Sequence, residues 1–146
     1  MPKTSIRKAL LLGLVLLAPG EADALCSDGR RPNVAEEFRT STKVVVGKVI
    51  ASENYSSVDA PEGIQGTRYT LRVIEAYKGR LDPTLRVTSE NTSARFPFDQ
   101  GQTYLLFVSS YGNEDGVDPC GNSGPIEEKA RERDSVRRLS GSRIRP

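Results

Sequence analysis

The alternation of apolar and polar residues along the chain predicts a mainly β protein. The most β-prone run is residues 43–51, in which three consecutive valines precede Gly47 and a second apolar stretch follows it. β-Branched side chains favour strands, and a run that is apolar on both faces is typical of a strand covered on both sides. A glycine inside a strand indicates a bulge, a bend or a close backbone approach. We therefore expect a long strand that pairs with one neighbour before Gly47 and with another after it, as in a small closed barrel.

Four further segments have strand patterns. Residues 67–78 alternate cleanly as far as Ile74, where the phase breaks, and this predicts a bulge near Glu75. Residues 54–66, before this strand, read as a long polar loop, a kind of segment that is often functional. Shorter strands are expected at residues 85–89, at residues 102–109, and around Val117 after a hairpin turn.

Two helices are expected beside these strands. Asn33 is a suitable N-cap with Glu36 three residues later, so we expect a helix over residues 34–40 whose Phe38 packs on the sheet. Pro125 suits the first position of a second helix ending near Leu139. Its apolar residues do not form one stripe, so we expect it to dock weakly. Five strands and two short helices fit a five-stranded OB-type barrel, with a β-sandwich as the alternative.

The first 24 residues have the pattern of a signal peptide. A basic head precedes an apolar run at residues 9–18 that is too short to span a bilayer. Ala22 and Ala24 then supply the small-x-small pattern of a signal-peptidase site. We expect a secreted or periplasmic protein that begins at Leu25, with a domain over residues 25–139 and a flexible tail over residues 140–146. The sequence has no second long apolar run, so we expect no membrane span.

The chain has two cysteines, Cys26 and Cys120, both in the expected mature part. An even cysteine count in an exported chain favours a disulfide. The alternatives are two free thiols or an intermolecular bond.

Composition excludes several function classes. The chain has no histidine, so Ser-His-Asp and Cys-His catalytic sets and the usual zinc ligands are absent. Residues 25–126 carry a net charge of −2 and residues 127–146 a net charge of +3. This is not the charge distribution of a nucleic-acid binder. We expect no catalytic residues, no metal site and no cofactor.

Several polar residues have both a functional and a structural interpretation. Glu114, Asp115 and Asp118 could bind calcium, but their spacing fits a solvated hairpin turn better. Ser123 is interpreted as a helix cap rather than a nucleophile. Lys48 and Lys78 are interpreted as exposed lysines at strand edges rather than as catalytic bases.

Tyrosines could form a stacking platform for sugars or bases, although filling or rimming the core is the favoured interpretation; they are Tyr55, Tyr69, Tyr77 and Tyr111.

An ordered set of motifs resembles a known family. It comprises Phe38, the run Val44-Val-Val-Gly-Lys-Val, the run Tyr69-Thr-Leu-Arg-Val-Ile-Glu-Ala-Tyr-Lys-Gly, the spaced Phe98, Gly101 and Tyr104-Leu-Leu-Phe, and Cys120-Gly-Asn-Ser-Gly-Pro. Together these resemble the netrin-like N-terminal domain of tissue inhibitors of metalloproteinases, and most closely its compact bacterial relatives. The resemblance covers about residues 26–128. It implies a secreted OB-fold barrel with its N-terminal segment held by a disulfide, and a protein partner that could be a zinc metalloprotease.

The N-terminal segment departs from the family pattern. In the animal inhibitors a leading cysteine chelates the zinc of the protease through its amine and carbonyl, and a second cysteine follows two residues later. Here Leu25 is the expected first residue, and Asp28 stands in place of the second cysteine. We therefore expect a non-enzymatic module with a partner-binding edge at Leu25, Cys26, Ser27 and Asp28. The alternative is an OB-fold module that binds oligosaccharide or belongs to the cell envelope.

Overall fold

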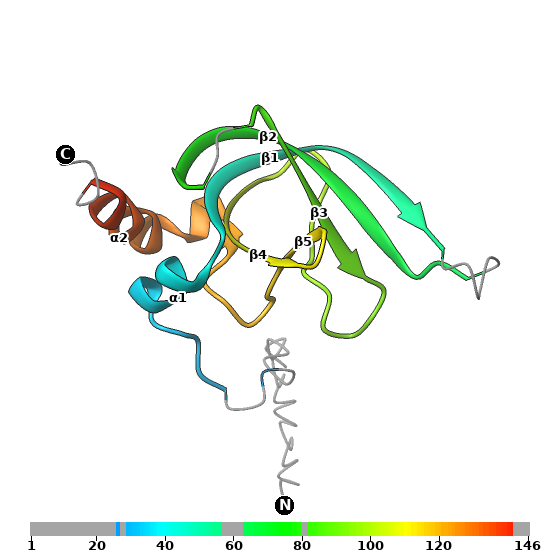
Figure 1. The fold of residues 1–146 in the computed structure, drawn as a ribbon, viewed down its shortest axis with the longest axis horizontal. Helices are drawn as coiled ribbons and strands as arrows, with labels where there is room; N and C mark the ends of the chain where they lie inside the picture. Colours follow the sequence, from blue (N-terminus) through cyan, green and yellow to red (C-terminus); the bar gives the residue numbers. More distant parts are fainter. Residues whose placement is uncertain (1–25, 27–28, 57–62, 80–81, 142–146) are drawn as a thin grey trace, which may run out of the picture.

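One antiparallel sheet with two helices forms the fold in this computed structural model, which describes residues 26, 29–56, 63–79 and 82–141 (Figure 1). The expectation of a mainly β protein is confirmed. The strands are β1 (Lys43–Tyr55), β2 (Gly66–Lys78), β3 (Thr84–Glu90), β4 (Thr103–Tyr111), β5 (Glu114–Val117) and the two-residue β6 (Gly124–Pro125). Their order is β3-β2-β1-β4-β5, and β6 pairs with β4. The expected signal peptide, residues 1–24, and most of the expected tail lie outside the described residues.

The first helix forms where the sequence predicts it. α1 (Val34–Thr40) begins after Asn33, whose Oδ1 accepts a hydrogen bond from the Ala35 N–H at 2.8 Å. Phe38 is buried and holds the helix on the sheet, as expected.

The second helix begins later than predicted. Pro125 does not start a helix, because its backbone is extended and pairs with Tyr104 of β4. A short 3-10 helix, η1 (Ile126–Glu128), follows, and α2 (Ala130–Gly141) begins only after Lys129. The pairing of β6 with β4 therefore replaces the first turn that the sequence pattern indicated.

β1 is the central strand of the sheet. It pairs with β2 along nearly its whole length, and its first half, up to Lys48, also pairs with β4. The expectation of one neighbour before Gly47 and another after it is wrong, because β2 accompanies β1 on both sides of this glycine. Beyond Lys48, β1 pairs with β2 but no longer with β4, and this part of β2 also pairs with β3 on its other side.

The expected irregularities in these strands are confirmed. The β1–β2 register shifts between Val46 and Gly47 and again between Val44 and Val45, which leaves Ile74 and Tyr77 unpaired on either side of Glu75. At Gly47 a Cβ atom would stand 3.3 Å from the Leu71 Cβ. The glycine thus allows the two strands to approach closely at the bend.

Apolar residues pack on both faces of the sheet. On β1, Val45 and Val49 join one buried cluster, whereas Val44 and Val46 join a second cluster with Phe38 of α1 and Val136 of α2. This alternation accounts for the run that is apolar on both faces. Burying one such valine stabilises the fold by roughly 1.5–3 kcal/mol.

The sheet is not closed by strand pairing. β3 and β5 are its two edges, and they lie beside each other (Figure 1). A Cβ atom on Gly116 of β5 would stand 3.8 Å from the Thr88 carbonyl oxygen of β3. The described pairing is that of an open sheet whose edges approach, so the expected closed barrel is not established.

Candidate functional site

The expected partner-binding edge is attached to the body of the protein by a disulfide. Cys26 and Cys120 are bonded, with 5.6 Å between their Cα atoms and a sequence separation of 94. This confirms the predicted pairing. The other residues of the predicted edge, Leu25, Ser27 and Asp28, lie outside the described residues.

A second attachment lies a few residues further along the chain. The loop at residues 118–123, here called the Cys120 loop, carries Asn122, which is only 5% exposed. Its Nδ2 donates to the Pro32 carbonyl oxygen at 2.8 Å and to Glu37 Oε2 at 2.6 Å. Its backbone N–H also donates to Glu37 Oε2, at 2.8 Å. The Cys120 loop therefore holds the N-terminal segment at both Cys26 and Pro32.

Glu37 is the acceptor at the centre of this arrangement. Burial raises the pKa of its carboxyl above the usual value, and the two hydrogen bonds from Asn122 oppose this effect. Nearby charges add smaller effects: Asp118 raises the pKa and Lys129 lowers it. The carboxylate also fills the space beside Gly121, where a Cβ atom would stand 2.1 Å from Glu37 Oε1. Only glycine fits at this position without displacing the carboxylate.

The Cys120 loop is anchored to the core at its other end. Ser123 Oγ accepts a hydrogen bond from the Phe107 N–H of β4 at 2.8 Å, and the contact is buried. The prediction that Ser123 caps a helix is therefore wrong, since the following residues form β6. Within the loop, Asp118 Oδ1 accepts from the Cys120 N–H at 2.8 Å, and the Gly121 N–H donates to the Asp118 carbonyl.

Sequence reasoning found the two cysteines but missed Glu37 and Asn122. The local sequence gives one indication that Glu37 is structurally important: it directly precedes the buried Phe38 on α1, a helix that follows a short polar segment. Nothing in the sequence pairs it with Asn122, 85 residues away.

Lys78 is not an exposed edge lysine as predicted. Its Nζ donates to three carbonyl oxygens at the end of α1, those of Phe38, Arg39 and Ser41, at 2.8, 2.7 and 2.5 Å. Carbonyls at a helix C-terminus lack intrahelical partners, and a cation there also complements the helix dipole. Lys78 thus fixes the end of α1 that precedes β1.

The tyrosines do not share one surface. Tyr69 packs against the cluster that contains Phe98, with 4.8 Å between the ring centroids. Tyr77 packs against the other cluster, with α1 and α2. The favoured interpretation, that tyrosines fill or rim the core, holds for these two. Tyr111 differs, because it is 70% exposed.

Of the three acidic residues near β5, Glu114 and Asp115 belong to a hairpin, as favoured, whereas Asp118 follows β5 and belongs to the Cys120 loop. Asp115 accepts hydrogen bonds from Lys43 Nζ and from Ser110 Oγ, which connects the hairpin to β1 and β4. Within the part of the chain that the structure describes, no group of three or more cysteine or acidic side chains is placed to hold a metal ion.

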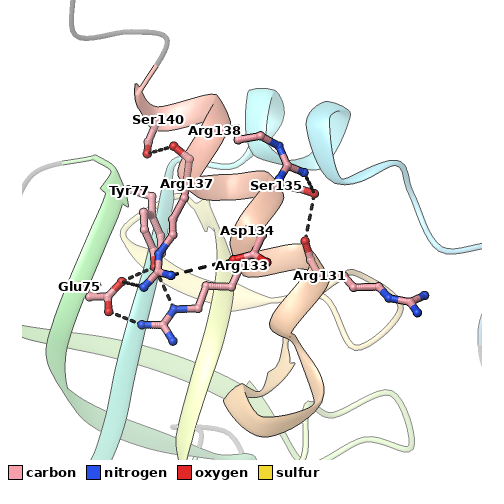
Figure 2. Close-up of polar contacts among 9 residues, drawn as sticks. All are labelled: Glu75, Tyr77, Arg131, Arg133, Asp134, Ser135, Arg137, Arg138 and Ser140. Carbon is pink, nitrogen blue, oxygen red and sulfur yellow. Dashed lines mark hydrogen bonds and ion pairs between the residues drawn. The ribbon is translucent and has the colours of Figure 1, made fainter.

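α2 is fixed by a polar cluster on β2 (Figure 2). Glu75 accepts hydrogen bonds from the Tyr77 hydroxyl and from Arg133, and Arg137 lies 3.5 Å away. The Tyr77 hydrogen bond, supported by the two arginines, lowers the pKa of Glu75. Val136 of α2 is fully buried. The docking contacts of α2 are therefore more extensive than its sequence pattern indicated.

The long loop between β1 and β2 is shorter than expected. β1 extends to Tyr55 and β2 starts at Gly66, and the Gln65 N–H donates to the Tyr55 carbonyl at 2.8 Å. Residues 57–62 of this loop lie outside the described residues.

Among the helices that the structure describes, none is both long and apolar enough to cross a membrane. A scan of protein-family models and a search of curated proteins gave no match for this chain.

Proposed function

We propose that this protein is a secreted, non-enzymatic module that binds a protein partner through its N-terminal edge, Leu25 to Asp28. The observation that carries the proposal is that the chain is attached to the Cys120 loop at two points, within this edge by the Cys26–Cys120 disulfide and shortly after it by the Asn122–Pro32 hydrogen bond. A segment held in place before binding loses less conformational entropy when it binds, and this improves affinity. The resemblance to the netrin-like domain of tissue inhibitors of metalloproteinases is the reason for choosing a protein partner.

The proposal includes a five-stranded OB-type barrel. In support, the order β3-β2-β1-β4-β5 brings the edges β3 and β5 side by side, which is the arrangement that a five-stranded barrel requires. The helices α1 and α2 pack together on the second apolar cluster. Loops at one end of such barrels commonly bind ligands.

The proposed partner class includes zinc metalloproteases, but without zinc chelation by the N-terminus. Chelation by an amine and a carbonyl requires both groups on the first residue. With Leu25 first, the disulfide fixes the neighbouring residue, Cys26, instead. A leading, disulfide-bonded cysteine would instead carry the amine and the carbonyl on the residue that the disulfide fixes.

The test compares three forms of the protein against a panel of zinc endopeptidases: one starting at Leu25, one starting at Cys26, and the Leu25 form acetylated at its N-terminus. We expect the two Leu25 forms to behave alike, because the amine is not a zinc ligand. Loss of inhibition on acetylation would show that chelation occurs. Inhibition by the Cys26 form alone would show that the extra leucine blocks it.

Partner binding itself is tested by affinity capture from the secreted fraction of the producing organism. The bait starts at Leu25, and the matched control bait carries Asn122→Ala, which removes one attachment of the edge. We expect a protein that the first bait retains more strongly than the second. Equal capture by both baits, or retention of glycans instead of protein, would contradict the proposal.

A further inference from the structure

A cavity of about 400 Å³ opens at the seam between the two sheet edges. We call it the seam cavity; its lining comes from residues 88–90 of β3, residues 92 and 94–96, Tyr111, and residues 114–119. Asp118 and Pro119 in its wall immediately precede Cys120, so the cavity adjoins the loop that holds the N-terminal edge. Its volume falls within the range of small-ligand sites.

The lining of the seam cavity includes buried or partly buried apolar side chains and one exposed aromatic ring. Phe96 is 6% exposed and belongs to the first apolar cluster, against which Val117 also packs. The Tyr111 ring rests on Gly116, where a Cβ atom would stand 3.6 Å from the ring, and most of the ring faces solvent. Such a surface suits a side chain with an apolar stem, and an exposed tyrosine face attracts a cation.

The charged residues of the lining are mostly acidic. The lining contains one guanidinium, that of Arg95, and four carboxylates, those of Glu90, Glu114, Asp115 and Asp118. Asp115 is paired with Lys43. Glu114 is 3.7 Å from Arg68, which is a long and exposed contact. The rim therefore keeps an excess of negative charge beside the Tyr111 ring.

We propose that the seam cavity binds an arginine side chain of the protein partner. A guanidinium bonds two carboxylates through its fork of N–H donors and stacks on aromatic rings, whereas a lysine ammonium is a compact point charge. The methylene stem would lie on Phe96 and Val117, and the guanidinium would lie between Tyr111 and the carboxylates of Glu90 and Glu114. That the arginine belongs to a protein rests on the proposed function; the cavity's preference for arginine does not.

The test titrates the disulfide-bonded protein with a short acetylated and amidated Gly-Arg-Gly peptide and follows backbone amide shifts by NMR. The matched control peptide carries citrulline, which has the same shape without the charge. We expect shifts confined to residues 88–96 and 111–119, at least fivefold weaker binding of the citrulline peptide, and weaker arginine binding as salt is raised. Equal binding of the two peptides, shifts elsewhere, or no shifts would overturn the proposal, and so would preferential binding of a Gly-Glu-Gly peptide.

Single variants test which residues of the seam cavity bind the arginine side chain. Glu114→Gln should weaken arginine binding about two- to fivefold, the effect of one exposed ion pair, whereas Arg95→Gln should strengthen it by removing a like charge. Glu36→Gln, on the exposed face of α1 and outside the cavity lining, should leave it unchanged. The same effect of all three variants would overturn the assignment. Because the peptide reports on the cavity alone, a peptide that binds while no partner is captured refutes only the proposed function.

Discussion

Glu37 Oε2 on α1 accepts two hydrogen bonds from Asn122, one from its backbone N–H at 2.8 Å and one from its side-chain amide at 2.6 Å. The same amide donates to Pro32, so this carboxylate orients the residue that attaches the N-terminal segment. A structural contact between α1 and the Cys120 loop therefore also positions the proposed binding edge.

Replacing Glu37 by alanine should be costly. The change leaves the largely buried Asn122 N–H without its acceptor, and an unsatisfied buried donor costs about 1–3 kcal/mol. Glu37→Gln should be much milder, because an amide oxygen can accept both bonds. Chemical denaturation of the two variants at neutral pH measures the difference. Equal losses in both would show that the charge, rather than the acceptor, matters.

The pH dependence of Glu37→Gln follows from the raised pKa of Glu37. A carboxyl with a higher pKa in the folded state binds its proton more tightly there, so its contribution to stability falls as pH rises from about 4.5 through the folded pKa. The variant lacks this titration. The stability of Glu37→Gln relative to the wild type should therefore increase across that interval, as measured by denaturation at a series of pH values. A constant difference would contradict the assignment.

The contribution of Glu75 to stability should depend on pH in the opposite direction from that of Glu37. Its pKa is lowered, first by the Tyr77 hydrogen bond and then by Arg133 and Arg137. Its contribution is present above about pH 4.5 and is lost as pH falls through the folded pKa. Glu75→Gln should lower stability by about 1 kcal/mol at neutral pH and should show less further loss in acid than the wild type. Glu36→Gln, an exposed carboxylate on α1, is the control that should follow the wild type.

Gly121→Ala should destabilise the protein, because the new Cβ would stand 2.1 Å from Glu37 Oε1. Relieving that overlap requires displacement of the carboxylate from Asn122, at a cost of about 1–3 kcal/mol. Gly141→Ala, where a Cβ would meet nothing within 4 Å, should change stability by less than about 0.5 kcal/mol. In a double-mutant cycle, Gly121→Ala should cost less in the Glu37→Ala background. Additive losses would show that the overlap is relieved elsewhere.

Local patterns in the sequence predicted much of this fold. Asn33 and Phe38 define α1 through neighbours a few residues away, and the valines of β1 carry the alternation between two cores within one short run. The disulfide was predictable because the chain has only two cysteines.

The errors arose where distant residues decide the local structure. Pro125 is compatible with a helix start, but β4 holds it in an extended conformation. Lys78 lies on a strand edge, but the carbonyls at the end of α1 accept its three hydrogen bonds. The same limit concealed the Glu37–Asn122 contact, because no spacing rule links residues so far apart.

Removal of the disulfide tests its contribution to stability and its contribution to partner binding separately. Cys26→Ser with Cys120→Ser opens a loop that spans 94 positions, and the loop-entropy account gives a loss of about 4 to 5 kcal/mol. Asn122→Ala removes the other attachment at a smaller cost, about 1–2 kcal/mol. Both changes free the N-terminal segment, so both should weaken partner binding mainly through faster dissociation. Binding is measured at a temperature where circular dichroism shows that each variant is folded.

The matched control is Val136→Ala, a change on the buried face of α2 that should lower stability by about 2 kcal/mol. It leaves both attachments intact, so its affinity should equal that of the wild type. If Val136→Ala weakens binding as much as the serine variant, general loss of stability explains the effect, and the attachment of Cys26 and Pro32 to the Cys120 loop has no separate role in recognition.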